Sequence, residues 1–166
     1  LDERVKQIGN LRLFASERSA GQQMDFRGRK YSVEDLANSD FTGLDVVFFS
    51  AGTEVSLKYC PKAVEAGALV IDNTNAHRMM PEVPLVVPEA NLHAAKRHKG
   101  LIANPNCSTI QMIVALAPIH RVNPIRRIVV STYQSVSGTG LEAIDILKRQ
   151  SEAMLAGKEP PTGVYP

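Results

Sequence analysis

The sequence predicts an α/β fold built on a parallel sheet, because short apolar runs alternate with helical patterns along most of its 166 residues. The segment 46–50 reads VVFFS, an unbroken apolar run typical of a strand that is buried on both faces. Apolar residues at helical spacing follow at 54–66, and this pattern ends at Gly67, a residue favoured just after a helix. Another apolar run begins at once at 69–71, so this part of the chain predicts a strand–helix–strand unit.

The remaining elements are predicted in the same way, from apolar periodicity and turn residues. We expect further strands at 11–15, 85–87, 101–103 and 128–133, and further helices at 91–96, 108–119 and 140–156. The tail at 157–166 is rich in proline and glycine and has no period. Because the pattern changes at about Asn104, we expect one domain over residues 1–103 and the start of a second over 104–166.

Composition excludes several classes of protein. A formal net charge of +2 is too small to indicate a nucleic acid or a membrane surface as partner, and the basic cluster at 93–99 fits a solvated helix end. No apolar run approaches the ~20 residues that span a bilayer. The two cysteines, Cys60 and Cys107, form neither a disulfide framework nor a metal-site spacing, which suits a reducing cytoplasm. We therefore expect a cytoplasmic protein without a bound metal.

Cys107 is the strongest candidate for chemistry. The segment 104–111, NPNCSTIQ, leaves a predicted strand, turns at Pro105 and opens a long apolar helix. Free backbone N–H groups and the positive end of the helix dipole favour the reactive thiolate there, and the same N–H groups can hold an oxyanion. The alternative is a small buried residue, which is the usual role of a free cysteine. The polar, sharply turned surroundings favour the nucleophile, whereas Cys60 lies within a predicted helix and is interpreted as packing.

Two further segments follow predicted strands. Ser16, Arg18 and Ser19 come after the strand at 11–15, where an arginine suits a ribose 2′-phosphate better than the acidic residue of NAD-binding proteins. From these residues alone, a polar surface turn is equally acceptable. Ser50-Ala51-Gly52 ends the strand at 46–50 and opens a helix, at the edge where parallel sheets bind ligands, although this tripeptide by itself is weak evidence.

The segment 103–116, ANPNCSTIQMIVAL, resembles the active-site segment of aspartate-semialdehyde dehydrogenases. Further matches stand in the same order on both sides of it: ASERSAG (15–21), FFSAG (48–52), VIDNTNAHRM (70–79), VPLVVPEAN (83–91) and VVSTYQSVSGTG (129–140). Several motifs in register are far more specific than any one of them.

This resemblance implies a doubly wound, Rossmann-type NADP-binding domain followed by the start of an α+β catalytic and dimerisation domain. It implies an NADP-dependent oxidoreductase that interconverts aspartyl-4-phosphate and aspartate 4-semialdehyde through a cysteine thioester, on the route to lysine, threonine, methionine and isoleucine. The family also implies a small-molecule substrate and a homodimer or homotetramer.

The resemblance assigns a role to each matching residue. Cys107 would be the nucleophile, with Gln134 beside it, and Arg78, Asn106 and Gln134 would contact the substrate, Arg78 through its phosphoryl group. The cofactor would contact residues of three segments: Ser16, Arg18 and Ser19; Ser50, Ala51 and Gly52; Ser137 and Gly138. His77 stands where many relatives carry an aromatic apolar residue, and we interpret it as a local variant rather than a base.

Three parts of the family pattern have no match within residues 1–166: the first strand with its glycine-rich turn, the histidine base, and a second substrate-binding arginine. We therefore expect little turnover from these residues alone, and an unpaired gap between the strands at 11–15 and 46–50. Two alternatives remain open. One is a related semialdehyde dehydrogenase for another acyl group, and the other is a truncated, non-catalytic paralogue.

Overall fold

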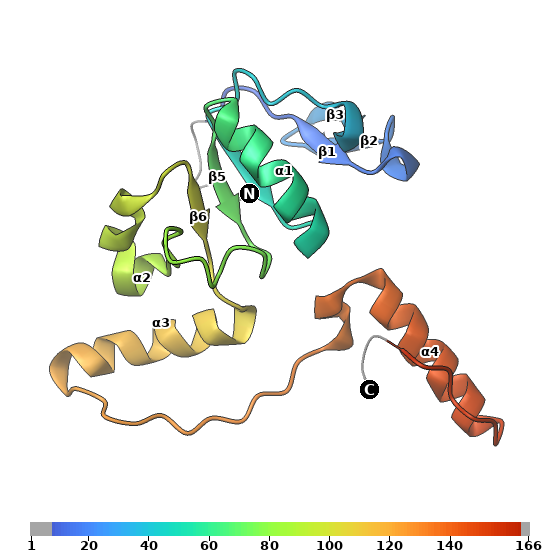
Figure 1. Ribbon diagram of the computed structural model, residues 1–166. Coiled ribbons are helices and arrows are strands. Elements are labelled where there is room, and N and C mark those ends of the chain that lie inside the picture. The colour runs from blue at the N-terminus through green and yellow to red at the C-terminus, as the bar shows by residue number, and fades with distance from the viewer. Residues whose placement is uncertain (1–7, 164–166) are drawn as a thin grey trace.

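The computed structural model describes residues 8–163, and its centre is a parallel sheet of three strands (Figure 1). The strands are β4 (Val46–Phe49), β5 (Leu69–Asp72) and β6 (Leu101–Ala103), in the spatial order β4-β5-β6. All three run parallel, and Phe49, Asp72 and Ala103 lie in register at their carboxyl ends. The predicted parallel sheet is confirmed, and its strands end together on one edge.

Helix α1 (Thr53–Glu65) connects β4 to β5 and covers one face of this sheet. Tyr59, Cys60 and Ala63 are buried on its inner side, as the helical spacing predicts. The helix ends before Gly67, whose φ of 91° is strained for residues with a side chain. These residues join the main core, whose other buried members are Phe41, Val47, Phe49, Ala68, Val70 and Leu101.

The N-terminal part forms a second sheet, with the spatial order β1-β3-β2. Strand β1 (Leu13–Ala15) pairs in parallel with β3 (Arg29–Asp35), and β2 (Gln23–Phe26) pairs antiparallel with β3. The β2–β3 hairpin was not predicted from the sequence, because most of its residues are polar and exposed. The signal was its two-residue turn, where Arg27 and Gly28 both adopt positive φ, as hairpin turns of this kind require.

The chain between β5 and α3 confirms three predicted elements. Leu85 forms a single parallel bridge with Ala103, next to the short helices α2 (Pro88–Asn91) and η3 (Leu92–Arg97). Strand β6 then leads through a three-residue turn into the long helix α3 (Cys107–Val122). The helix begins one residue earlier than predicted and ends three residues later.

One predicted strand is wrong: residues 128–133 are extended, but they pair with no strand of the described chain. An extended segment becomes a strand only when a neighbour satisfies its backbone groups. Val129, Val130 and Tyr133 accordingly remain exposed. The short helix η4 (Val136–Thr139) and the predicted amphipathic helix α4 (Leu141–Leu155) follow, and α4 stands apart from both sheets (Figure 1).

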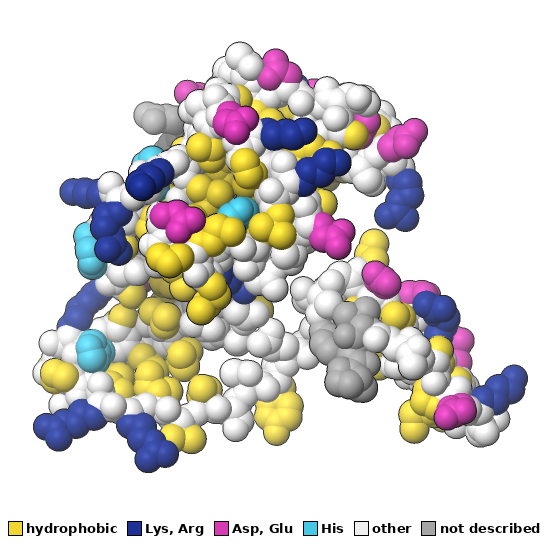
Figure 2. All heavy atoms as spheres, in the orientation of Figure 1, with side chains coloured by type: hydrophobic (Ala, Val, Ile, Leu, Met, Phe, Trp, Pro, Cys, Tyr) yellow, Lys and Arg dark blue, Asp and Glu magenta, His cyan; other side chains and the backbone are white. Residues whose placement is uncertain are grey.

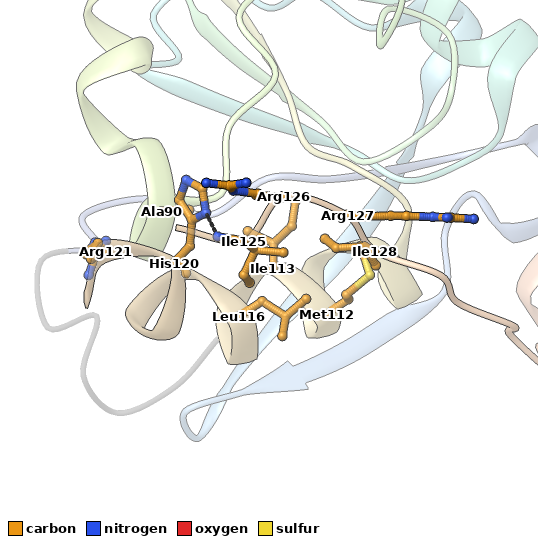
Figure 3. Close-up of a pocket in the computed structure, with 11 residues that line it drawn as sticks. Ala90, Met112, Ile113, Leu116, His120, Arg121, Ile125, Arg126, Arg127 and Ile128 are labelled. Carbon is orange, nitrogen blue, oxygen red and sulfur yellow. Dashed lines mark hydrogen bonds between the residues drawn. The ribbon is translucent and has the colours of Figure 1, made fainter. Parts of the chain in front are cut away.

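An apolar groove of about 440 Å³ lies between α3 and the segment that turns back after it (Figure 3). Met112, Ile113 and Leu116 form its helical wall, and the backbone N–H of Ile125 donates to His120 Nδ1 at 3.0 Å. Hydrophobic side chains are visible at the surface of this region among Lys, Arg and His side chains (Figure 2). At about 1.5 Å per residue, the groove begins roughly 7 Å along the helix axis from Cys107, so it is separate from the thiol.

A second cavity, of about 490 Å³, lies between the two sheets. It is lined by residues 10–14, which lead into and begin β1, and by residues 46–51, which form β4 and the start of its loop. Leu36, Phe41, Leu44 and Val55 complete the lining. Within residues 8–163, strands β1 and β4 each pair with a neighbour on one side only, and not with each other. This agrees with the expected gap: in the described part of the chain, two strand edges without a paired strand border one mainly apolar cavity.

The isolated 166-residue polypeptide is therefore expected to aggregate at micromolar concentration and to enhance the fluorescence of an apolar dye such as ANS. Unpaired strand edges and exposed apolar surface both promote association. Sedimentation velocity and dye titration measure the two effects. A monodisperse monomer that unfolds cooperatively and does not bind the dye would show that other residues close the gap.

Candidate functional site

The candidate site lies where β4, β5 and β6 end. Each strand opens at its carboxyl end into a loop that carries sequence-predicted residues: Ser50–Gly52 after β4, 73–78 after β5, and 104–107 after β6. Open parallel sheets bind ligands at this edge. Because the three strands are parallel and in register, the loops are neighbours although up to 57 residues separate them in sequence.

Cys107 is the first residue of α3, and its side chain is exposed. Asn106 caps the helix: its Oδ1 accepts hydrogen bonds from the Ser108 backbone N–H at 3.0 Å and from Ser108 Oγ at 2.8 Å. The Cys107 thiol lies 3.7 Å from the same oxygen. A thiol at this place meets the positive end of the helix dipole, while a polar cap holds the turn in shape.

Gln134 is brought to Cys107 from the extended segment after α3. Its Nε2 donates to Ser108 Oγ at 3.1 Å and to Asn106 Oδ1 at 3.3 Å, while its Oε1 accepts from Asn106 Nδ2 at 3.4 Å. The Cys107 thiol is 4.0 Å from Gln134 Oε1. Three residues predicted from sequence, two of them adjacent and one 27 positions away, therefore form one polar cluster.

Arg78 is half-buried at the end of the loop after β5. Its Nε donates to the Asn104 carbonyl at 2.9 Å, and its Nη2 donates to the Asn73 carbonyl at 3.0 Å. Asn73 Nδ2 in turn donates to Ser50 Oγ at 3.3 Å. Hydrogen bonds thus connect all three loops, and Arg78 is tied directly to the turn that carries the cysteine.

Asp72 is fully buried at the end of β5 and is the hub of the site's hydrogen bonds. Its Oδ1 accepts from Ser56 Oγ at 3.0 Å and from the Thr74 backbone N–H at 2.9 Å, and its Oδ2 accepts from Thr74 Oγ1 at 3.1 Å. His77, also buried, places Nδ1 2.7 Å from Oδ2. Burial raises the pKa of Asp72, but the hydrogen bonds from His77, Thr74 and Ser56 outweigh it, so this pKa lies below its ordinary value.

Sequence reasoning missed this hub. It interpreted His77 as a local variant and did not consider Asp72 at all. One signal was available: a buried strand that ends in Asp, followed two residues later by Thr, is a pattern in which the carboxylate bonds the chain just ahead of it. The contribution of Ser56 had no such signal, because it comes from another element 16 residues earlier.

Cys60, Asp72 and His77 also place their ligand-type atoms within 4.8 Å of one another. The Asp72 oxygens already accept four hydrogen bonds from protein groups, which argues against a metal there. Burial raises the pKa of the Cys60 thiol to about 12. Cys60 is buried, which confirms its interpretation as a packing residue.

The predicted cofactor segments are exposed. Ser16 precedes the short helix η1 (Glu17–Ser19) at the carboxyl end of β1, and Arg18 within it accordingly faces solvent. No residue in the described range 8–163 accepts a hydrogen bond from Arg18. Ser137 and Gly138 lie in η4, where Ser137 Oγ and Ser135 Oγ are 2.7 Å apart. A Cβ built on Gly138 would meet no atom within 4 Å, so this turn is open.

Among the described residues, no helix is long and apolar enough to cross a membrane.

Two family models match the chain. The model of the semialdehyde dehydrogenase NAD-binding domain matches residues 1–98, and that of the semialdehyde dehydrogenase dimerisation domain matches 116–166. The aspartate-semialdehyde dehydrogenase of Aquifex aeolicus is 51% identical over 164 residues, which are 97% of this chain and 48% of that protein. The enzyme of the same name from Synechocystis sp. is 48% identical over 159 residues, 96% of this chain and 47% of its own.

Solved structures of proteins with the same name also superpose on this chain. Aspartate semialdehyde dehydrogenase II of Vibrio cholerae, complexed with ASA, superposes with a TM-score of 0.85 at 45% identity, covering 98% of this chain and 49% of that one. The Candida albicans enzyme with NADP gives a TM-score of 0.56 at 26% identity, over 69% and 40% of the two chains. The chain spans about half the length of the relatives it matches. Because the model of the semialdehyde dehydrogenase NAD-binding domain matches more than half of its residues, the chain belongs to the semialdehyde dehydrogenase family. It resembles the aspartate-semialdehyde dehydrogenases within that family over nearly its whole length.

Proposed function

We propose that the protein containing this chain reduces aspartyl-4-phosphate to aspartate 4-semialdehyde through a thioester on Cys107, and catalyses the reverse reaction. The observation that carries this proposal is the cluster of Cys107, Asn106 and Gln134 at the first turn of α3, with Arg78 bonded to the turn just before it. This arrangement offers a nucleophile, amide groups and a guanidinium on one edge of the sheet.

Each of these groups has a part in acyl transfer. The Cys107 sulfur attacks the acyl carbon, an S–C bond forms, and the bond from that carbon to the phosphate oxygen breaks. Arg78 binds the phosphoryl group, for which a planar cation with several N–H donors is suited. The free backbone N–H groups at the start of α3 stabilise the oxyanion, and Gln134 orients the acyl group beside the thiol. Phosphate leaves with its oxygen, and the acyl group stays on sulfur.

NADP is the proposed cofactor, and it would supply the hydride that reduces the thioester. The residues present fit it: Arg18 is exposed without a protein acceptor in the described range, so its guanidinium is available to a 2′-phosphate. Ser16 immediately precedes the short helix that carries Arg18, and Ser19 is its last residue. Ser50–Gly52 at the end of β4 and Ser137–Gly138 in the open turn would contact other parts of the dinucleotide.

Replacing Arg18 by alanine is expected to weaken NADP binding by ~1.5–3 kcal/mol, the range for hydrogen bonds to charged groups, and to leave NAD binding nearly unchanged. Isothermal titration of both cofactors against the natural gene product measures this. Arg27, which lies in the β2–β3 turn with its guanidinium over the Phe26 ring, offers an Arg27→Ala control. An equal loss for both cofactors would show that Arg18 does not distinguish the 2′-phosphate.

We also propose that the chain divides at about residue 104 into a dinucleotide-binding domain and the start of a catalytic domain that assembles as a homodimer or homotetramer. Support for assembly comes from the match of 116–166 to a dimerisation-domain model. The same stretch of chain exposes large apolar side chains: Val122, Val129, Tyr133, Leu141 and Leu155. Exposed apolar surface is typical of a region that another subunit covers in an assembly.

The substrate is tested by assaying the natural gene product in the oxidative direction, with NADP, phosphate and either aspartate or glutamate semialdehyde. We expect turnover with the aspartyl compound and at least roughly a hundredfold lower kcat/KM with the glutamyl compound, since an extra methylene alters the distance between the carbonyl and the α-carboxylate. A preference for the glutamyl compound would favour the alternative family member. Absence of turnover with both, together with co-purification of a longer homologue, would favour a non-catalytic paralogue.

A further inference from the structure

The loop that carries Arg78 is organised from inside by a single buried carboxylate. Asp72 accepts from the backbone N–H and the hydroxyl of Thr74, and from Nδ1 of His77. Thr74 Oγ1 also accepts from the Ala76 backbone N–H at 3.2 Å. The carboxylate therefore reaches three of the five residues from 74 to 78, directly or through one hydroxyl.

Arg78 completes this arrangement from outside. Its Nη2 donates to the carbonyl of Asn73, which immediately follows Asp72, so the loop from 72 to 78 is closed upon itself. Its Nε donates to the carbonyl of Asn104, three residues before Cys107. Neither of these bonds uses Nη1. Backbone carbonyls of two different loops thus hold two nitrogens of the planar guanidinium, and the position of Nη1 follows from them.

We propose that Asp72 is a positioning residue for the phosphoryl group: it holds the loop in the one conformation in which Arg78 faces the reacting acyl phosphate beside Cys107. This inference rests on the proposed function of Arg78. Asp72 is fully buried, so it does not touch substrate and acts through Thr74, His77 and the backbone between them. A long, flexible guanidinium binds an anion more strongly when its orientation is set in advance.

The contact between Asp72 and Ser56 provides an internal control. Ser56 lies on α1, and its hydroxyl donates to the same carboxylate at 3.0 Å without touching the loop. Ser56→Ala removes one bond of the network but leaves those from Thr74 and His77 in place. If Asp72 has only a structural role, loss of the Ser56 bond and loss of a Thr74 or His77 bond should both lower stability and leave phosphate affinity unchanged. If Asp72 positions Arg78, loss of a Thr74 or His77 bond should lower phosphate affinity, and loss of the Ser56 bond should not.

The test measures binding of inorganic phosphate to the natural gene product by ³¹P NMR titration, well below the melting temperature of each variant. Asp72→Asn and Thr74→Val are each expected to weaken phosphate binding about tenfold, the equivalent of one hydrogen bond to a charged group. Thr74→Ser keeps the hydroxyl and should restore the affinity of the unaltered protein. Ser56→Ala should lower the melting temperature and leave phosphate affinity within twofold. If Asp72→Asn does not fold, the comparison of Thr74→Val with Thr74→Ser tests the proposal by itself.

The possible failures are distinguishable. If the unaltered protein and an Arg78→Ala variant bind phosphate equally, the proposed role of Arg78 is wrong, and the positioning role of Asp72 is wrong with it. If Arg78→Ala loses phosphate but Thr74→Val retains it, only the positioning role is overturned. Equal losses of phosphate affinity in Ser56→Ala and Thr74→Val would also overturn it, because the effect would then follow general destabilisation.

Discussion

Replacing Cys107 by serine is expected to lower kcat of the natural gene product by at least ~10⁴-fold, the scale of effect seen when a covalent nucleophile is removed. A serine hydroxyl is nearly isosteric with the thiol but is hardly ionised near neutral pH, and no described side chain within bonding distance of Cys107 can take its proton. Its neighbours are the amide oxygens of Asn106 and Gln134. Steady-state kinetics with NADP, phosphate and aspartate semialdehyde would measure the loss.

The chain offers a matched control in its second cysteine. Cys60 is buried within α1, so Cys60→Ala is expected to lower stability by about 1–2 kcal/mol and to leave kcat within a few-fold of the unaltered value. Cofactor binding by the Cys107→Ser variant should be unchanged, which separates loss of chemistry from loss of the fold. Retained turnover in Cys107→Ser, or an equal loss in Cys60→Ala, would contradict a thioester on Cys107.

The second large effect is a difference in alkylation between the two cysteines. At pH 7.5 with iodoacetamide, Cys107 is expected to react at least ~10³-fold faster than Cys60. A pKa of about 12, raised chiefly by burial, makes the Cys60 thiolate roughly 10³ times rarer than that of an ordinary thiol with a pKa of about 8.5. Burial also denies the reagent access to Cys60, whereas Cys107 is exposed. Quenched time points analysed by peptide mass mapping would give both rates.

Unfolding supplies the control for this measurement. In concentrated guanidinium chloride both cysteines are exposed to solvent, so their alkylation rates should converge to within a few-fold. This result is expected because the fold, and not the local sequence, protects Cys60. Equal labelling in the folded protein would show that Cys107 has no special reactivity. Faster labelling of Cys60 would show that α1 does not pack against the sheet as described.

The elements with an apolar face were predictable, because the apolar residues of each buried face recur at a regular spacing in the sequence. Strand β6 was predicted at its observed bounds, and α1 and α4 to within a residue or so at each end. The β2–β3 hairpin was missed because its alternating apolar residues, Met24, Phe26, Tyr31 and Val33, stand in short and otherwise polar runs, whose structure depends on pairing. The strand predicted at 128–133 was wrong for the related reason that an apolar run specifies no partner.

In the candidate site, too, the features with a local sequence signal could be predicted, and those that depend on distant contacts could not. By itself, the sequence determined that Cys107 stands where a strand turns into a helix, since Asn-Pro-Asn before an apolar period is a local signal. Only the tertiary structure decided that Gln134 lies against this turn, that Arg78 is tied to Asn104, and that Asp72 receives hydrogen bonds from two elements. Local signals report interactions within about one helical turn, whereas the parallel sheet brings together loops that are tens of residues apart. The position of Cys107 at the start of a helix could therefore be predicted from the chain alone. The hydrogen bonds of Asp72 and Arg78, which connect separate loops, could not.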